Sequence, residues 1–185
     1  MSRTFFAIPI DKMLLDVMRA PFERLRAELG NSVEWIPEQN WHITLRFLGE
    51  INHKQLATLV EAAREIAHDT APGFIRVKML APFPRSDAKH IAWHLHSSPL
   101  LKSLADKLSG AAFAVGVSKD TRRFRPHVTL GKIRYATHPF LPILLEQIDL
   151  AFTELVLYES KFQVDGGIYR KLQVFKLSQR GNDDE

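Results

Sequence analysis

The sequence contains no cysteine, and this absence excludes several classes of functional site. Disulfide bonds, iron–sulfur clusters, zinc held by thiolates and thiol nucleophiles all require cysteine. The chain also has no apolar run near the roughly 18 residues that a membrane-spanning helix needs. The apolar stretch at its start is too short for a secretory signal. We therefore expect a cytoplasmic protein that does not bind or span a membrane.

Two motifs that commonly mark catalytic or nucleotide-binding sites are missing as well. There is no Gly-x-Ser-x-Gly turn to present a serine nucleophile, and no glycine-rich loop of the type that cradles nucleotide phosphates. His94 and His96 have a spacing that a metal could use, but no set of acidic ligands lies nearby. We interpret them, together with His90, as the polar face of an amphipathic strand. The sequence therefore predicts neither a cofactor nor a metal ion.

The overall composition is that of an ordinary globular domain. Hydrophobic residues make up 45% and charged residues 25% of the 185 residues, so the chain can bury a substantial core without disulfides. We expect a single domain over residues 1–180. Residues 181–185 include three acidic side chains, and we predict that they form a solvated tail.

Hydrophobic periodicity predicts an α+β fold. Asp11 is a suitable helix cap and Gly30 a suitable helix end, while residues 81–84 and 165–167 are expected to interrupt strands through their prolines or glycines. The predicted strands cover residues 4–10, 33–36, 42–48, 74–80, 89–96, 127–133, 153–157 and 169–177, and the predicted helices cover residues 11–29, 53–67, 99–115 and 142–150.

One tetrapeptide occurs twice in nearly the same form. His42-Ile43-Thr44-Leu45 returns 85 residues later as His127-Val128-Thr129-Leu130. The same offset places residues 6–8 on residues 91–93 and most of the first predicted helix on the third. The sequence thus predicts a duplicated, two-lobed domain in which two antiparallel sheets flank a central cleft and helices lie outside. On the approximate two-fold axis of such a domain, the two His-x-Thr strands can face each other.

Each tetrapeptide places an imidazole and a hydroxyl side by side. Because side chains alternate along a strand, His42 and Thr44 share one face, as do His127 and Thr129. Histidine titrates near pH 6.5, so around neutrality one ring can act as a base while the other acts as an acid. Displacement at phosphorus needs both, and the hydroxyls can donate to phosphoryl oxygens. This pairing predicts a bell-shaped pH profile with a maximum near neutrality.

Basic residues gather around the second tetrapeptide. Between positions 119 and 134 there are six basic residues and one acid, Asp120. The segment is either a solvated surface loop or an anion site, because clustered cations raise the local concentration of phosphates. If the substrate is an oligonucleotide, we expect three arginines of this segment to contact phosphates upstream of the reacting end: Arg122, Arg123 and Arg125.

The paired motifs resemble those of the 2H phosphoesterase superfamily. The resemblance is closer to the RNA 2′,3′-cyclic phosphodiesterases, also called 2′-5′ RNA ligases or the ThpR/LigT family. It covers nearly the whole chain. The segments that carry it are residues 3–8, 40–49, 124–130, 157–160 and 167–169.

The resemblance implies a LigT-like fold and metal-independent opening of a 2′,3′-cyclic phosphate at an RNA 3′ end, which leaves a 2′-phosphomonoester. It assigns His42 as proton donor and His127 as proton acceptor, with Thr44 and Thr129 holding phosphoryl oxygens. No cofactor is implied. We expect a monomer that acts on RNA without an obligate protein partner.

Three further residues are assigned to substrate binding. Lys132 stands where the family often has arginine, so it keeps the charge but lacks the two-pronged guanidinium. Phe6 matches an aromatic residue of the opening strand that could stack on a base, with core packing as the alternative. Arg125 is the third.

Two other functions stay open at this point. One is a 2H phosphoesterase that acts on a small cyclic nucleotide, a 2′-5′-linked oligonucleotide or an ADP-ribose cyclic phosphate. The other is a catalytically silent module that binds RNA or a nucleotide on the same fold. Both tetrapeptides are complete in this sequence, which favours an enzyme.

Overall fold

The computed structural model describes residues 3–84, 89–135, 142–145, 149–161 and 168–178, and the predicted turn at 165–167 and the predicted tail at 181–185 lie outside these ranges. The elements in chain order are β1 (Arg3–Pro9), α1 (Lys12–Leu29), η1 (Gly30–Ser32), β2 (Val33–Trp35), η2 (Glu38–Asn40), β3 (His42–Gly49), α2 (His53–His68), β4 (Gly73–Phe83), β5 (His90–Leu95), α3 (Pro99–Ala114), β6 (His127–Ile133), β7 (Ile143–Leu144), β8 (Asp149–Phe152), β9 (Glu154–Lys161) and β10 (Ile168–Lys176).

The three long helices begin at side chains that cap their free N–H groups. Asp11 accepts a hydrogen bond from the backbone N–H of Leu14 at 2.8 Å, as predicted for the cap of α1. Asn52 and Gln55 form a reciprocal capping box on α2, and Ser98 caps α3. Among the helices of the described segments, none is both long enough and apolar enough to cross a membrane.

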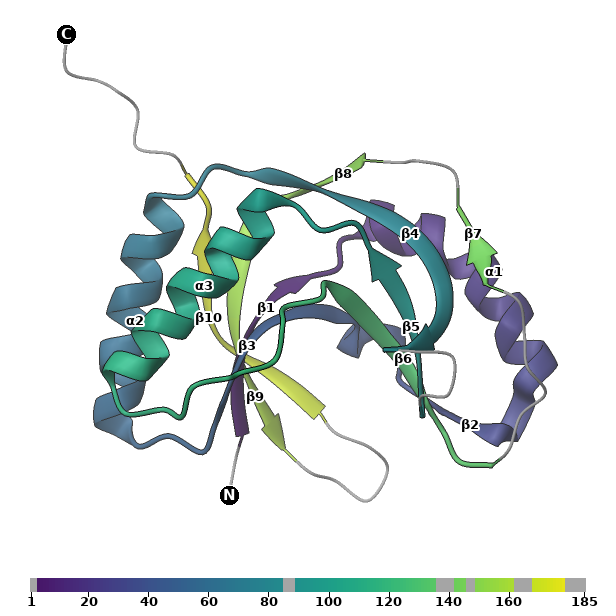
Figure 1. Cartoon of the computed structure of the whole chain (residues 1–185), viewed down its shortest axis with the longest axis horizontal. Coiled ribbons are helices and arrows are strands. Elements are labelled where there is room, and N and C mark those ends of the chain that lie inside the picture. The colour runs from purple at the N-terminus through teal and green to yellow at the C-terminus, as the bar shows by residue number, and fades with distance from the viewer. Residues whose placement is uncertain (1–2, 85–88, 136–141, 146–148, 162–167, 179–185) are drawn as a thin grey trace, which may run out of the picture.

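The strands form an antiparallel sheet in the order β10-β9-β1-β3-β6-β5-β4-β7, with β2 paired to β6 and β8 to β4. Its two parts, β10-β9-β1-β3 and β6-β5-β4-β7, are joined by a single recorded residue pair, Ile43 with Val128. Helices α2 and α3 lie side by side at one end of the molecule, and α1 lies at the other (Figure 1). This arrangement matches the predicted α+β class.

Strand pairing follows the same register in both parts of the sheet. Pairs between β1 and β3 recur 85 residues later between β5 and β6, and both ladders contain a register shift at the same step. The backbone around the two His-x-Thr motifs is therefore the same, including its irregularity. The matching pairs are Phe5–Phe47 with His90–Lys132, Phe6–Arg46 with Ile91–Gly131, Ala7–Thr44 with Ala92–Thr129, Ile8–Ile43 with Trp93–Val128, and Pro9–His42 with His94–His127.

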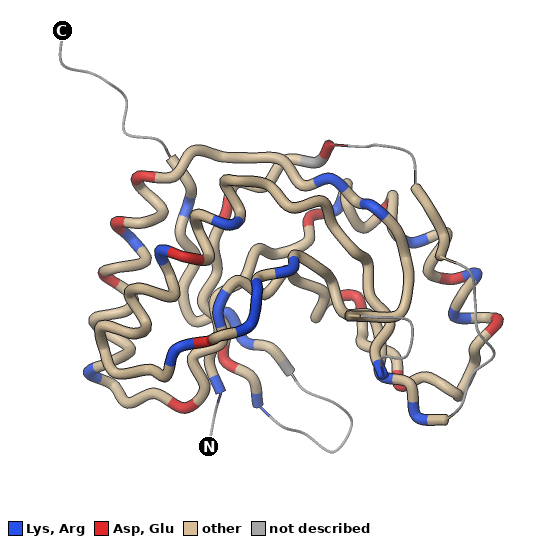
Figure 2. The backbone as a smooth tube through the Cα atoms, viewed as in Figure 1, with Lys and Arg blue, Asp and Glu red and all other residues tan. Residues whose placement is uncertain are grey.

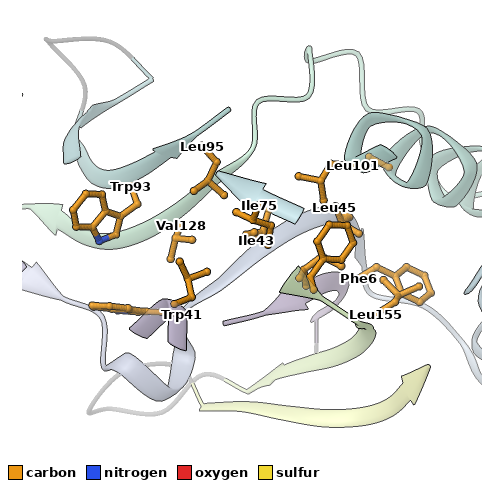
Figure 3. Close-up of a cluster of buried hydrophobic side chains, with 14 of the residues drawn as sticks. Phe6, Trp41, Ile43, Leu45, Ile75, Trp93, Leu95, Leu101, Val128 and Leu155 are labelled. Carbon is orange, nitrogen blue, oxygen red and sulfur yellow. The ribbon is translucent and has the colours of Figure 1, made fainter. Parts of the chain in front are cut away.

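One apolar core extends through both parts of the sheet (Figure 3). Phe6 is fully buried and belongs to this core, as does Leu155, and both are labelled in Figure 3. The prediction that Phe6 stacks on a base is therefore wrong. The physical reason is that residues 5–8 are all apolar, so the pattern alone does not show which of them point into the core.

The predicted helix over residues 142–150 is also wrong. Within the described residues this stretch contains β7, which pairs with Met79 and Leu80, and the start of β8, which pairs with residues 73–76. An ion pair of 2.6 Å between Arg76 and Asp149 also links β4 to β8. The edge of β4 satisfies the backbone of this segment, and such pairing overrides a short helical pattern.

Strand β4 continues through Pro82 to Phe83, although the sequence predicts a break at residue 81. Beyond Leu80 the described strands pair with β4 only on the β5 side, where Pro82 lies opposite Ile91. A proline is tolerated in a strand where its missing N–H faces an unpaired side. The longer strand carries Phe83 to the neighbourhood of the second motif.

Candidate active site

The two His-x-Thr motifs meet at the junction of β3 and β6. The strands are joined by the buried residues Ile43 and Val128, which lie opposite each other. Because side chains alternate along a strand, the histidine and threonine on either side of each buried residue project from the other face of the sheet. An antiparallel register continued by one residue in each direction would bring His42 level with Thr129, and Thr44 level with His127.

The backbone holds both histidine rings in the same way. Nδ1 of His42 lies 2.7 Å from the carbonyl oxygen of Asn40, and Nδ1 of His127 lies 2.7 Å from the carbonyl oxygen of Arg125. A carbonyl oxygen can only accept, so each Nδ1 carries a proton and donates it to the hydrogen bond. Nε2 is consequently the atom that takes up and releases a proton in both rings.

Aromatic side chains surround His42. Its ring centroid lies 4.8 Å from that of Phe5, 5.2 Å from that of Tyr169 and 6.0 Å from that of Tyr158. Nε2 lies 3.0 Å from the hydroxyl of Thr44, which donates to it while the ring is neutral. Burial raises the pKa of Tyr158 to about 12 and also raises the pKa of Tyr169, so both phenols stay uncharged. The first motif therefore has a neutral, largely apolar surrounding.

The second motif has a more polar surrounding. Phe83 stacks on His127 with ring centroids 3.8 Å apart and 17° between the planes. His94 lies opposite His127 in the ladder, and its Nε2 donates to the carbonyl oxygen of Pro82 at 3.0 Å. His90, on the same strand, is exposed. In the part of the chain that the structure describes, no three His, Asp or Glu side chains gather as a possible metal site.

Burial shifts the proton affinity of both catalytic candidates. It lowers the pKa of His42 to about 4, with a smaller lowering by His127 and an opposing hydrogen bond to Asn40. It also lowers the pKa of His127, with smaller contributions from His94 and His90. Both rings are therefore mainly neutral at pH 7 without a ligand. A bound phosphate anion favours the protonated form and raises both pKa values.

A cationic segment, residues 118–126, connects α3 to β6 and is here called the basic loop. Figure 2 shows its Lys and Arg residues in the middle of the molecule. Buried Arg46 of β3 donates to the carbonyl oxygen of Ser118 and lies 3.8 Å from a carboxylate oxygen of Asp120. Arg122 donates to the same carboxylate at 2.9 and 2.8 Å, and this lowers the pKa of Asp120 to about 2. The loop is thus tied to the strand of the first motif.

The two remaining predicted binding residues flank His127 in the sequence. Arg125 is exposed, and its carbonyl oxygen holds the ring of His127. Lys132 is exposed and lies opposite His90 on one side and Glu34 of β2 on the other. The structure therefore places both cations near the second motif, while their contact with a substrate stays a prediction.

A family model described as LigT like Phosphoesterase matches residues 8–93, which include the first His-x-Thr motif. An RNA 2′,3′-cyclic phosphodiesterase of Geobacillus stearothermophilus is 29% identical over 171 residues, which are 88% of this chain and 53% of that protein. A protein of the same name from Thermotoga maritima is 26% identical over 176 residues, 92% of each chain. The chain is thus similar to LigT-like phosphoesterases over residues 8–93 and to RNA 2′,3′-cyclic phosphodiesterases over most of its length.

Solved structures place this chain in the LigT fold. The crystal structure of E. coli LigT without ligand superposes with a TM-score of 0.80 and 24% identity, and covers 96% of this chain and 98% of that one. A protein of Thermus thermophilus gives a TM-score of 0.82 and 21% identity over 96% and 99% of the two chains. These likenesses confirm the predicted fold. The chain nevertheless spans only about half the length of the Geobacillus relative.

Sequence patterns miss two aromatic residues of this candidate site. Ala7 lies opposite Thr44, so alternation along β1 brings Phe5, and not Phe6, to the site face. The repeated offset aligns Ala7 with Ala92, but only the strand register shows that both lie opposite a threonine of the motif. Phe83 carries no such local signal, since it stands between two prolines.

Proposed function

We propose that this chain is a LigT-like phosphoesterase that hydrolyses 2′,3′-cyclic phosphates at the 3′ ends of RNA and leaves 2′-phosphomonoesters. The names of its curated relatives support this substrate. The observation that supports the chemistry is that both histidine rings are held in the same way, with Nδ1 hydrogen-bonded to a backbone carbonyl oxygen. Because each backbone carbonyl fixes Nδ1–H, two Nε2 atoms remain for proton transfer at one small area of the sheet. A reaction that removes one proton and delivers another needs such a pair.

In the proposed step, Nε2 of neutral His127 accepts a proton from water while the water oxygen attacks phosphorus. The bond between phosphorus and the 3′ oxygen breaks, and Nε2 of protonated His42 gives its proton to that oxygen. The products are a 2′-phosphomonoester and a free 3′ hydroxyl. His127 then releases its proton to solvent and His42 takes one up. The protons therefore balance over the cycle, and no metal ion is needed.

The threonines and Lys132 stabilise the charge that grows on the phosphoryl oxygens. When Nε2–H of protonated His42 is directed at the 3′ oxygen, the hydroxyl of Thr44 no longer donates to Nε2, and its proton is available for a phosphoryl oxygen. Thr129, which the continued antiparallel register would bring level with His42, is placed to donate to a second oxygen. Lys132 supplies a positive charge from the same strand as His127.

Binding of the substrate favours the protonated form of His42, which the proposed acid role requires. With its pKa near 4, His42 is mainly neutral in the free protein at pH 7. The negative charge of the cyclic phosphate raises that pKa when it binds, because opposite charges at short range favour the ionised form. Proton uptake by His42 therefore accompanies substrate binding. The donor and acceptor roles themselves follow the family resemblance and are tested below.

We also propose that residues 1–180 form one duplicated domain that acts as a monomer. The shared register of β1 with β3 and of β5 with β6 supports the duplication, because five successive pairs and a register shift recur at one offset. Analytical ultracentrifugation of the full chain, with and without an RNA end, measures the oligomeric state.

The experiment that tests the function uses a synthetic RNA that ends in a 2′,3′-cyclic phosphate, incubated with the protein in excess chelator. We expect the RNA to gain one water molecule by mass spectrometry and to elute with a synthetic 2′-phosphate standard. The double variant His42→Ala/His127→Ala, purified in the same way, controls for contaminating nucleases. Lack of conversion, a 3′-phosphate product, or loss of activity caused by the chelator alone would overturn the proposal.

A further inference from the structure

A second concave site lies beside the second motif. It has a volume of about 450 Å³ and is bounded by β4, β5, the beginning of α3 and the basic loop. Its apolar walls include Phe83, Phe124 and Pro126. Its polar lining is mainly cationic, with Lys78, Lys102, Arg122, Arg123 and Arg125 against one carboxylate, Asp106. We call this site the basic groove.

Only part of the charge in the basic groove is neutralised within the protein. Lys102 forms an ion pair of 2.6 Å with Asp106, and Arg122 is paired with Asp120 outside the groove lining. No described carboxylate lies within ion-pair distance of Lys78, Arg123 or Arg125. Three positive charges are thus left for an anionic ligand. A ligand with a phosphate suits them, because guanidinium groups bind phosphate oxygens through paired hydrogen bonds.

Two side chains connect the basic groove to the candidate catalytic area. Phe83 lines the groove with one part of its surface and stacks on His127 at 3.8 Å. His94 lines the groove and lies opposite His127 in the ladder. A molecule in the groove is therefore an immediate neighbour of the second histidine, separated from it by one side chain.

The loop that forms one wall of the basic groove is fixed before any ligand arrives. Buried Arg46 donates to the carbonyl oxygen of Ser118, and Asp120 bridges Arg46 and Arg122. Because this network holds the start of the loop against β3, less conformational freedom is lost when Arg123 and Arg125 bind an anion.

We propose that the basic groove binds the phosphodiester and nucleoside on the 5′ side of the reacting RNA end. This inference rests on the proposed function and names the part of the substrate that the two histidines and two threonines of the motifs do not hold. The unpaired cations bind the upstream phosphate, and the aromatic and proline walls contact the attached ribose or base. The groove thereby makes an oligonucleotide a better ligand than a mononucleotide with the same end.

Binding of product analogues tests the groove without requiring turnover. The two probes are adenosine 2′-phosphate and the dinucleotide ApA with the same 2′-phosphate end, and the readout is the dissociation constant by isothermal titration calorimetry. The groove variant is Lys78→Gln/Arg123→Gln. The matched control is Arg24→Gln/Lys54→Gln, which removes two positive charges from exposed positions on α1 and α2.

We expect the unaltered protein to bind the dinucleotide roughly tenfold more tightly than the mononucleotide, since one charge-assisted phosphate contact has about this strength. The groove variant loses most of this preference and binds the mononucleotide nearly as before. Its salt slope for the dinucleotide falls by roughly one. The control variant keeps both the preference and the slope.

Equal affinity of the unaltered protein for the two probes, or a preference that survives in the groove variant, would overturn the groove proposal. A preference that falls equally in the control variant would assign it to net charge and also overturn the proposal. Turnover of the cyclic end, measured in parallel, keeps the two hypotheses apart. Binding as expected without turnover refutes the proposed function alone, while turnover without any preference refutes the groove alone.

Discussion

The two histidines occupy equivalent places in the backbone but have different neighbours. Both lie one residue before a core residue that joins β3 to β6, and both donate from Nδ1 to a carbonyl oxygen two residues earlier. His42 lies among Phe5, Tyr158 and Tyr169. His127 lies beside Phe83 and near the cations of the basic loop. A repeated scaffold therefore supplies the geometry, and the surroundings distinguish the two rings.

Residues 85 positions apart in the sequence occupy equivalent places in the two parts of the sheet, and one such pair shows this difference. Phe47 and Lys132 occupy the same place in the two ladders, opposite Phe5 and His90 respectively. The first part of the sheet thus presents an aromatic ring where the second presents a positive charge. The difference indicates a division of labour, in which one side contacts flat, apolar parts of a nucleotide and the other contacts its phosphates.

Arg46 and Gly131 form a second corresponding pair and show why the parts cannot be interchanged. A Cβ atom at Gly131 would lie 2.5 Å from Val33 and 3.1 Å from Trp35, because β2 pairs with β6 at this point and Trp35 lies opposite Gly131. In the first part, no described strand takes the place of β2, and Arg46 extends instead to the basic loop. The same strand position therefore allows close packing in one part and holds a loop in the other.

The largest expected effect tests whether the two parts contribute equally to catalysis. We expect His42→Ala and His127→Ala each to lower kcat by about 10²–10⁴, the usual range for a positioned acid or base. The double variant should lose much less than the product of the two factors, because both groups serve one transition state. Single-turnover rates on a cyclic-phosphate RNA measure this, with circular dichroism to check folding.

A substrate with a sulfur atom in the 3′ bridging position separates the two roles. Thiolate is a good leaving group without protonation, so His42→Ala should lose far less rate on this substrate, while His127→Ala should lose as much as before. If the two variants respond alike, the donor and acceptor assignment is wrong. His53→Asn, at an exposed position at the start of α2, is the control histidine.

The next effect sharpens the cationic side of the comparison. We expect Lys132→Gln to lower kcat/KM by roughly 10- to 100-fold for mononucleotide and oligonucleotide substrates alike, since a charge-assisted contact to the reacting phosphate is lost from both. Lys132→Arg should retain most of the activity. Unchanged kcat/KM in Lys132→Gln would show that this cation does not meet the reacting phosphate.

The outcome for Phe5 and Phe6 shows what the sequence could and could not predict. The helix caps, the repeated tetrapeptide and the α+β class follow from local patterns, and the structure agrees with them. The face to which a side chain points in a wholly apolar strand does not follow from such patterns, because both faces are buried. The resemblance assigns Phe6 to the site, whereas Phe5 is the residue whose ring lies beside His42.

Pairing between distant segments is the other part that local patterns cannot supply. Residues 143–144 and 149–152 pair with β4, which begins about 70 residues earlier, and no short window contains that information. The same holds for the approach of Phe83 to His127 and for the contact of Arg46 with the basic loop. The candidate catalytic residues could be predicted because the repeated tetrapeptide is visible in the sequence itself, whereas a contact between distant residues is not.

A smaller effect sharpens the aromatic side. The ring of Phe47 is 52% exposed and lies 5.6 Å from that of Phe5. We expect Phe47→Ala to raise KM by roughly tenfold, the lower part of the range for loss of one base stack, with the same salt dependence as the unaltered protein. Phe113→Ala, at a 64% exposed position on α3, is the control. A flattened salt dependence in Phe47→Ala would contradict the division of labour.

The smallest expected effect is a shift of the pH profile. It tests whether burial lowers the pKa values of the two histidines. Activity of the free enzyme requires one protonated and one neutral imidazole. Burial lowers both pKa values, that of His42 to about 4, so at pH 7 the missing form is the protonated one. Falling pH supplies it, and we expect kcat/KM to reach its maximum below pH 6.5, on the acidic side of the expectation from unperturbed histidines.

The bound state should behave differently, because the phosphate anion raises the pKa of each ring. The maximum of kcat should therefore lie at higher pH than that of kcat/KM. Binding of adenosine 2′-phosphate at pH 6.5 should take up protons, measured by calorimetry in two buffers that differ in ionisation enthalpy. This uptake should fall as the pH approaches 4, where the free protein already holds the proton. A maximum of kcat/KM above neutrality, or binding without proton uptake, would show that burial does not set the protonation of this pair.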